Sequence, residues 1–236
     1  MNNTESFRLG IIGAGIFAEA NHFPSLSLHF FDAVERAAVC DLNEARASRL
    51  ASKYGWKRTY TDFRKMVESE DLDGVIVCLG AKNHPAVVKD LLSMKMPVFL
   101  EKPSSVTAEE TEELAELATA AGIPVQVGQQ KRHGLAYKRA HEIVAGPDFG
   151  SVIQIESKMH GFTVFPTFYT CMLEWQCHNL DAVISFGGSI SEITARAHLT
   201  SASTGSLSAL LQFEDGATAT LGWGTYGGPG QYSERI

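Results

Sequence analysis

The chain has 236 residues, of which 44% are apolar and 20% charged, a composition typical of a globular protein that can bury a core. Its formal charge of −7 argues against nucleic-acid binding, and no basic run suggests attachment to a membrane surface. The sequence shows no signal peptide or membrane span and no C-x-x-C pair, so we expect a reduced, cytoplasmic protein without a metal site.

A glycine-rich turn follows the first apolar run. Residues 8–18 read R-L-G-I-I-G-A-G-I-F-A, which contains the G-x-G-x-x-A pattern. Gly13 permits a tight turn, Gly15 lets the backbone approach a pyrophosphate, and Ala18 lets the next helix pack on the strand. The N-terminus of that helix favours phosphate groups. By itself the pattern also fits an ordinary strand-to-helix turn.

The second expected strand, 34–41, ends in an acid. Asp41 at this place can accept a hydrogen bond from a ribose 2′-hydroxyl and repel a 2′-phosphate, which favours NAD over NADP. No arginine follows Asp41 immediately, although Arg46 could swing toward a phosphate and leaves NADP as an alternative. Residues 43–54 have the pattern of an amphipathic helix with Asn43 near its cap.

Strands and helices then alternate up to residue 128. We expect helices and buried strands, in chain order, at 61–69 (helix), 73–79 (strand), 85–94 (helix), 97–100 (strand), 107–121 (helix) and 124–128 (strand). Thr107 and Glu110 form a capping box, and Gly122 ends that helix. This alternation predicts a doubly wound parallel sheet, which we assign to a domain of residues 1–130.

The pattern changes after residue 130. We expect helical stretches at 135–145 and within 168–186, and strands at 151–159, 192–198, 207–213 and 217–223. These elements predict a second α/β domain, residues 131–236, with an antiparallel sheet and helices to one side. Residues 232–236 resemble the start of a further strand.

Two groups of polar residues are candidates for chemistry. Lys102 follows a strand directly, where ligands of open α/β sheets bind, and Pro103 keeps it extended. A lysine in such a crevice can transfer protons, while the alternative is a solvated surface lysine. If residues 174–181 are helical, Glu174, His178 and Asp181 lie on one face, where a carboxylate can fix the histidine tautomer. The alternatives there are a metal site or an ordinary polar face.

Together these residues resemble the Gfo/Idh/MocA family, to which glucose–fructose oxidoreductase and inositol 2-dehydrogenase belong. The resemblance runs from about Phe7 to Ile236 and rests on these motifs in order: Gly13, Gly15 and Ala18; Asp41 with Arg46 and Ala47; Asn83-His84; Glu101-Lys102-Pro103; Gly128 to Arg132; and Glu174, His178 and Asp181. It implies a Rossmann domain, a second domain on an open, mostly antiparallel sheet, and an NAD(P)-dependent oxidoreductase that transfers a hydride between the cofactor and a sugar or cyclic polyol.

The resemblance also implies roles for single residues. The expected catalytic residues are Lys102, His178 and Glu174, which stands in place of an aspartate, and Arg132 joins them in binding substrate. The expected cofactor-binding residues are Gly13, Gly15, Ile16, Phe17, Asp41, Arg46, Leu79, Asn83, His84, Glu101, Lys102 and Gln130.

Three departures from the family pattern affect the expected substrate. Leu79-Gly80 replaces a frequent Thr-Pro, Gln130 replaces an asparagine, and Gln176 replaces a glycine and could narrow the pocket. The family also contains sugar-binding sensors and NAD-assisted glycoside hydrolases, so both are alternatives to a dehydrogenase. The intact pair of Lys102 and His178 argues against a sensor.

The family pattern continues well beyond Ile236. We therefore expect the chain to be truncated, or its missing strands to come from elsewhere. A shortened sheet would expose strand edges and apolar surface, which favours a homo-oligomer, a dimer or tetramer, through this sheet. Because Lys102 and His178 belong to different domains, we expect the active site where the domains meet.

Overall fold

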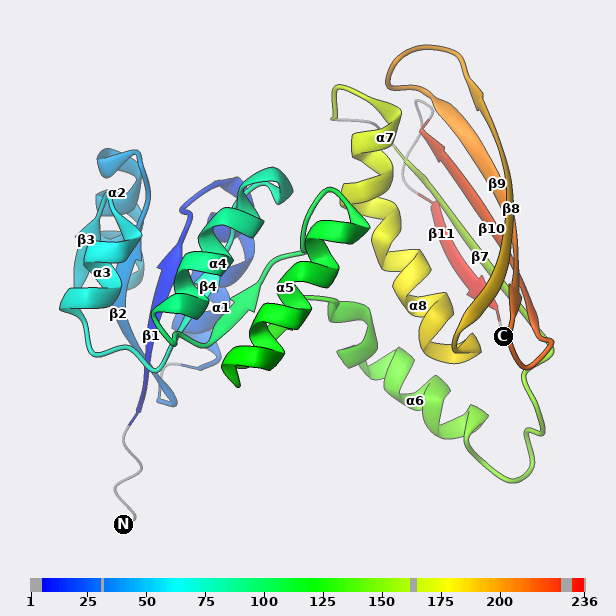
Figure 1. The fold of residues 1–236 in the computed structure, drawn as a ribbon, viewed down its shortest axis with the longest axis horizontal. Helices are drawn as coiled ribbons and strands as arrows, with labels where there is room; N and C mark the ends of the chain where they lie inside the picture. Colours follow the sequence, from blue (N-terminus) through cyan, green and yellow to red (C-terminus); the bar gives the residue numbers. More distant parts are fainter. Residues whose placement is uncertain (1–5, 31, 162–164, 226–230, 236) are drawn as a thin grey trace. The chain divides into compact units, whose positions relative to one another are not determined.

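The computed structural model describes residues 6–30, 32–161, 165–225 and 231–235. The chain forms two compact units, Met1–Gly128 and Gln129–Ile236 (Figure 1). Within the described residues, no helix has the length and apolar character needed to cross a membrane.

The first unit is built on a six-stranded parallel sheet. Its strands are β1 (Phe7–Ile12), β2 (Val34–Cys40), β3 (Arg58–Tyr60), β4 (Gly74–Val77), β5 (Val98–Leu100) and β6 (Val125–Val127). Their order in the sheet is β3-β2-β1-β4-β5-β6. From β1 the chain adds strands β2 and β3 on one side, and then β4, β5 and β6 on the other. In sheets of this kind, the point between β1 and β4 where the strand order reverses forms a crevice at the carboxyl ends of the strands. The predicted Rossmann fold is confirmed.

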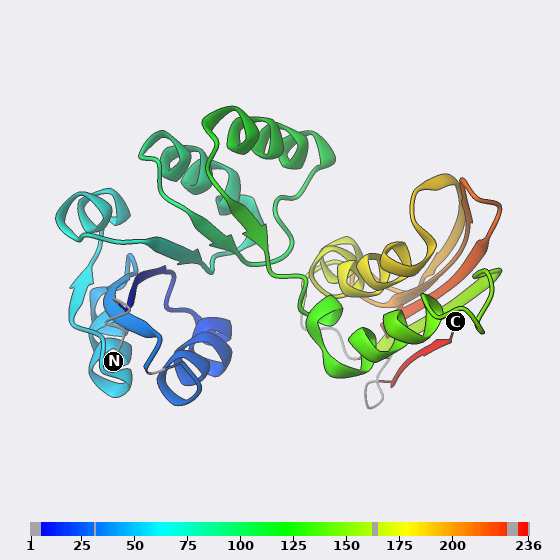
Figure 2. The same ribbon diagram turned by 90° about the horizontal axis from the view of Figure 1, so that it is seen from below.

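Helices cover both faces of this sheet (Figure 2). Helices α1 (Phe23–Leu28) and α2 (Glu44–Tyr54) pack on one face, and α3 (Phe63–Ser69), α4 (His84–Ser93) and α5 (Ala108–Ala121) pack on the other. Neighbouring residues of β1 therefore enter different cores, with Ile11 facing α1 and α2 and Ile12 facing the opposite layer. Burial on both faces explains why these strands have continuous apolar sequences.

The ends of the helices follow the predicted capping residues. The Asn43 side chain accepts the Arg46 N–H at 3.0 Å, and Thr107 accepts the Glu110 N–H at 3.2 Å. Gly122 ends α5 with φ +66°, a left-handed conformation that suits glycine. These local signals fix where α2 and α5 begin or end.

The second unit is built on a five-stranded sheet with the order β11-β7-β10-β9-β8. Its strands are β7 (Gln154–Gly161), β8 (Ile190–Leu199), β9 (Gly205–Phe213), β10 (Thr218–Thr225) and β11 (Gln231–Arg235). All neighbouring pairs are antiparallel except β7 with β10, which confirms the mostly antiparallel sheet. The further strand expected near residue 232 is β11.

Helices α6 (Leu135–Val144), α7 (Phe168–Cys171) and α8 (Cys177–Gly187) complete this unit. Val183 of α8 packs against Ile155 and Leu211, so α8 covers one face of the sheet (Figure 1). The His141 ring of α6 stacks on Phe186 of α8, with 3.9 Å between ring centroids. Short 3-10 turns occur at Ala81–Asn83 and Gln130–His133.

Two turns of π-helix interrupt what the sequence predicted as ordinary helices. The first, Ala18–His22, follows the glycine-rich turn, and the second, Met172–Gln176, precedes α8. Each π turn contains one residue more than an α turn, so the side chains beyond it face a different direction. Glu174 belongs to this π turn, whereas His178 and Asp181 belong to α8, so the three residues expected on one helix face lie on two successive helical elements.

Candidate cofactor and active-site residues

The glycine-rich turn has the geometry that its sequence predicts. Gly13 has φ +99°, and a Cβ at this position would lie 2.1 Å from the carbonyl oxygen of Cys78. A larger residue is therefore excluded there. A Cβ on Gly15 would meet no atom within 4 Å, so the backbone at Gly15 borders open space. Ile16 and Phe17 come next and are 90% and 46% exposed.

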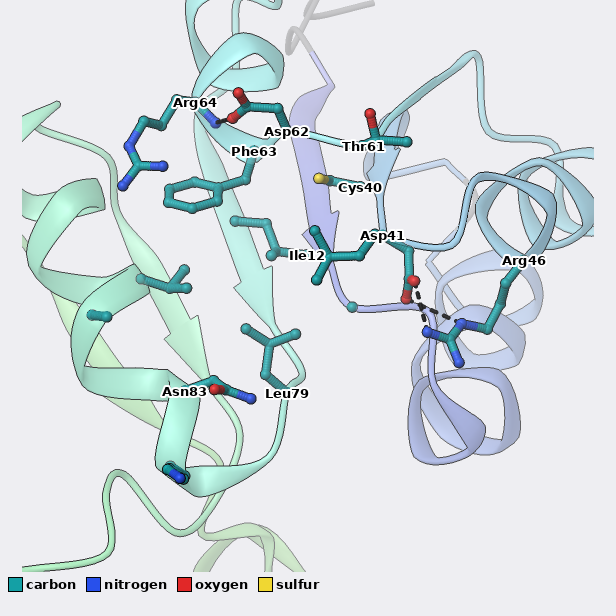
Figure 3. A pocket seen from close by; sticks show the side chains of 15 residues that line it. Ile12, Cys40, Asp41, Arg46, Thr61, Asp62, Phe63, Arg64, Leu79 and Asn83 are labelled. Atoms are coloured by element: carbon teal, nitrogen blue, oxygen red, sulfur yellow. Dashed lines mark hydrogen bonds and ion pairs between the residues drawn. The ribbon is translucent and has the colours of Figure 1, made fainter.

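A pocket of about 580 Å³ lies at the carboxyl ends of β1 to β4 (Figure 3). It is lined by Ile12, Gly13, Cys40, Asp41, Leu42, Arg46, Thr61, Asp62, Phe63, Arg64, Leu79, Lys82, Asn83, Ala86 and Val87. This volume is within the range of small-molecule sites. Five predicted cofactor-binding residues meet here, namely Gly13, Asp41, Arg46, Leu79 and Asn83.

The Asp41 carboxylate is held by four hydrogen bonds. One oxygen accepts the Asn43 N–H and Arg46 Nη2, at 2.8 and 2.7 Å, and the other accepts the Ala14 N–H and Arg46 Nε, at 2.8 and 3.2 Å. Burial alone would raise the pKa of Asp41, but Arg46 and the two backbone donors outweigh it and hold the pKa below its ordinary value. All four lone-pair positions are thus engaged, and a ribose hydroxyl would have to displace the Arg46 guanidinium.

A second cluster surrounds the Glu101-Lys102-Pro103 turn. Glu101 is 8% exposed; one carboxylate oxygen lies 2.8 Å from Nε2 of His22, and the other accepts the Lys102 N–H at 3.2 Å. Burial opposes ionisation of Glu101, yet the bond to His22 and the nearby Lys102 charge hold its pKa below the ordinary value. Lys102 Nζ lies 5.8 Å from the centroid of the Phe17 ring.

His84 supports the same turn from another side. Its side chain is completely buried, and its Nδ1 lies 2.9 Å from the carbonyl oxygen of Pro103. Burial lowers the pKa of His84, so the ring is neutral and Nδ1–H donates this bond. The His84 side chain has no accessible surface in this structure, so it supports the Pro103 turn from inside the first unit.

The predicted site residues of the second unit lie on the 3-10 turn Gln130–His133, the π turn and α8. The Arg132 Nε lies 2.8 and 2.9 Å from the two carboxylate oxygens of Asp181, so the acid expected beside His178 binds Arg132. Gln130 begins the 3-10 turn, and His178 is the second residue of α8.

Sequence reasoning missed a polar cluster beside His178. Asn179 is completely buried; it accepts Lys131 Nζ at 3.0 Å and donates to Ser157 Oγ at 2.7 Å. Gln176 is 3% exposed, so it lies inside the protein and not in an open pocket. A polar residue directly after His178 on an otherwise apolar helix face was the available signal. Among the described residues, no three His, Cys, Asp or Glu side chains gather in a possible metal site.

The chain is similar in sequence to a known protein family and to several named proteins. The family model GFO_IDH_MocA, described as an oxidoreductase family with an NAD-binding Rossmann fold, matches residues 7–129. Inositol 2-dehydrogenase of Salmonella typhimurium is 25% identical over 182 residues, which covers 75% of this chain and 54% of that protein. Inositol 2-dehydrogenase of Acidothermus cellulolyticus is 33% identical over 138 residues, or 58% of this chain and 40% of that protein. The chain thus spans about half the length of the curated relatives it matches.

Solved structures share the fold at low sequence identity. A dehydrogenase from Chromobacterium violaceum superposes with a TM-score of 0.89 and 22% identity, covering 97% of this chain and 68% of that chain. GenD2 from gentamicin A biosynthesis, solved in complex with NAD, has a TM-score of 0.85 and 20% identity, and the match covers 98% of this chain and 69% of that chain.

Proposed function

The chain belongs to the Gfo/Idh/MocA family of oxidoreductases with an NAD-binding Rossmann fold, and we propose that the protein is an NAD-dependent dehydrogenase acting on a hydroxyl-bearing carbon of a sugar or cyclic polyol. The proposal rests mainly on one observation. The glycine-rich turn borders open space at Gly15 and lies beside a pocket of about 580 Å³, at the point where the strand order of the sheet reverses. Relatives named inositol 2-dehydrogenase support a polyol as the substrate class.

The residues around the glycine turn fit a dinucleotide. The backbone at Gly15 borders open space and would receive the pyrophosphate, and the pocket beside Asp41 and Arg46 would receive the adenosine. Asp41 favours NAD, while the 44% exposed Arg46 side chain is the group that would meet a 2′-phosphate. When bound, the nicotinamide supplies the hydride acceptor.

The protein's own residues then handle the proton. We propose that Lys102 and His178 bind the reacting hydroxyl and transfer its proton. Glu174 would orient His178 or a substrate hydroxyl. A positioned acid–base group contributes about 10²–10⁴-fold in rate. Lys102→Met should lower turnover by about that factor and weaken NAD binding less.

A matched pair of glycine variants tests cofactor binding. Gly15→Ala adds a methyl group that meets no protein atom, so we expect unchanged thermal stability and lost NAD binding. Gly13→Ala forces a contact with Cys78 and should cost about 2–4 kcal/mol of stability. Calorimetric titration with NAD and NADP, beside thermal unfolding, measures both effects. Failure of the unaltered protein to bind either cofactor would refute the proposal.

The reaction is tested with NAD and a panel of sugars and cyclic polyols, following NADH absorbance. We expect NADH formation with at least one compound and its loss in Lys102→Met. Cofactor binding without NADH formation from any compound would favour the sugar-binding sensor.

The proposal extends to assembly and location. We propose a homo-oligomer formed through the sheet of the second unit, where Leu210 of β9 is 51% exposed. All four cysteines lie in the described part of the chain and none forms a disulfide. Unpaired cysteines fit a reducing compartment, so we place the protein in the cytoplasm.

A further inference from the structure

The Glu101-Lys102-Pro103 turn is fastened on both sides of its lysine. Before Lys102, the Glu101 carboxylate binds His22, and after it the Pro103 carbonyl binds His84. His22 belongs to the helical segment after the glycine turn, whereas His84 begins α4. Two distant segments of the first unit therefore fix the three-residue turn that carries Lys102.

We propose that His22 is a positioning residue for Lys102: by binding the Glu101 carboxylate, it sets the place of the lysine relative to the glycine-rich turn. The functional meaning of this position rests on the proposed function, in which Lys102 moves a proton. The contact itself is independent of that assignment.

The π turn explains how His22 reaches Glu101. The Phe23 N–H bonds to the carbonyl oxygen of Ala18, five residues earlier, so this turn contains an extra residue. His22 is the last residue of the turn, and only 16% of its side chain is exposed. Its ring lies edge-on to Phe17 and Phe99, with centroid separations of 5.9 and 6.0 Å. These contacts hold the imidazole in one orientation, with Nε2 directed at Glu101.

Charge and burial make this contact important for the turn. The ionised Glu101 carboxylate only accepts hydrogen bonds, so His22 Nε2–H donates. Among the described residues, His22 is the only side chain that hydrogen-bonds to Glu101, and the remaining carboxylate oxygen accepts the Lys102 N–H. A buried carboxylate that loses a donor turns toward water or another cation, because an unpaired buried charge is costly. Loss of His22 therefore releases the carboxylate and, with it, the backbone of Lys102.

Amide hydrogen exchange of Lys102, measured by NMR on the full chain, tests this step directly. In His22→Leu we expect the Lys102 amide to exchange roughly tenfold faster, the effect of losing about one charge-assisted hydrogen bond. His22→Gln places an N–H near the position of Nε2 and should restore the slow rate. His29→Leu, on the exposed end of the same helical segment, is the matched control and should behave as the unaltered protein.

Activity gives the functional readout. With NAD and a polyol that the unaltered protein oxidises, His22→Leu should lower kcat roughly tenfold with little change in KM for NAD, and His22→Gln should recover most of kcat. An unchanged Lys102 exchange rate in His22→Leu, or no recovery in His22→Gln, overturns the positioning role. If the unaltered protein binds no cofactor, the proposed function fails, while the exchange rates still decide whether His22 fixes the turn.

Discussion

Asp41 illustrates what a single residue reveals in the sequence and what it conceals. Its place after the second strand was predictable, because the sequence shows an apolar run followed by an acid. Its bonds to Arg46 were not, because they depend on how the first turn of α2 directs the arginine side chain. Asp41, predicted to bind a ribose, thus also links the glycine turn to the start of α2, because its carboxylate accepts hydrogen bonds from the backbone N–H groups of Ala14 and Asn43.

The same holds for the residues around Lys102. The sequence indicated the lysine and its strand, but not that His22 and His84 support it. These contacts join residues 79 and 19 positions apart in the chain. Local patterns carry no information about such pairs.

The lowered pKa of Asp41 predicts a pH-dependent contribution to stability. A carboxylate with a depressed folded-state pKa stabilises the fold above its unfolded pKa of about 3.9, and the contribution is lost as the pH falls through the folded-state value. Asp41→Asn should therefore cost about 1–3 kcal/mol at pH 7. The difference from the unaltered protein should shrink below about pH 4.

Urea unfolding followed by tryptophan fluorescence, to which the buried Trp56 of the first unit contributes, measures this difference at pH 7 and pH 3. Asp32→Asn, at an exposed position, is the control and should have little effect at either pH. A stability loss in Asp41→Asn that stays the same at both pH values would contradict the role of the ionised carboxylate.

At the scale of elements, capping residues were read correctly and π turns were not. Asn43 and Thr107 cap their helices through their own side chains, which is a local effect. A π turn of five residues leaves too short a pattern to distinguish from an α turn. Strand β3 was missed because Arg58 and Thr59 are exposed and the strand has no apolar run. A strand of three residues without an apolar run thus gives too weak a pattern to predict.

The contact between α8 and its sheet depends on the absence of one side chain. A Cβ on Gly187 would lie 2.2 Å from the end of the Phe213 ring, which is 1% exposed. We expect Gly187→Ala to destabilise the second unit by about 1–3 kcal/mol, because overpacking outweighs the gain in helix propensity near a helix end.

A double-mutant cycle with Phe213→Leu checks the cause of this effect. Leucine removes the end of the ring, so Gly187→Ala should cost less in the Phe213→Leu background than in the unaltered chain. Unfolding in urea, followed by circular dichroism, gives the four free energies. Equal costs in the two backgrounds would show that the Phe213 contact is not responsible.

At the scale of the whole molecule, the fold class was predictable because two signals agree. Alternating apolar strands and helices indicated the parallel sheet, and the glycine turn marked its first crossover. The change of pattern after residue 130 indicated a different second sheet, now seen as β7 to β11. The sequence does not show which apolar side chains of that sheet are exposed, and the structure does.

The outer face of the second sheet predicts self-association. Leu207 and Leu211 of β9 pack toward the core, so alternation along the strand places Leu210 on the opposite face, where it is 51% exposed. Its neighbour across the sheet is Thr194 of β8, and Ser208 and Gln212 flank it on the same face of β9. Glu192 and Arg196 of β8, which pair with Gln212 and Ser208, lie on this face too, so charged side chains border the exposed leucine, as at the rim of a contact surface.

We therefore expect the unaltered protein to elute as a dimer or tetramer in size-exclusion chromatography with light scattering, and Leu210→Arg to shift it toward monomer. An arginine at this place would bring a charge into the contact, which should weaken association by about a hundredfold or more. Leu135→Arg is the control, because Leu135 is 87% exposed on α6 and lies outside the sheet. A monomer of the unaltered protein at high concentration, or an equal effect of both variants, would place the contact elsewhere.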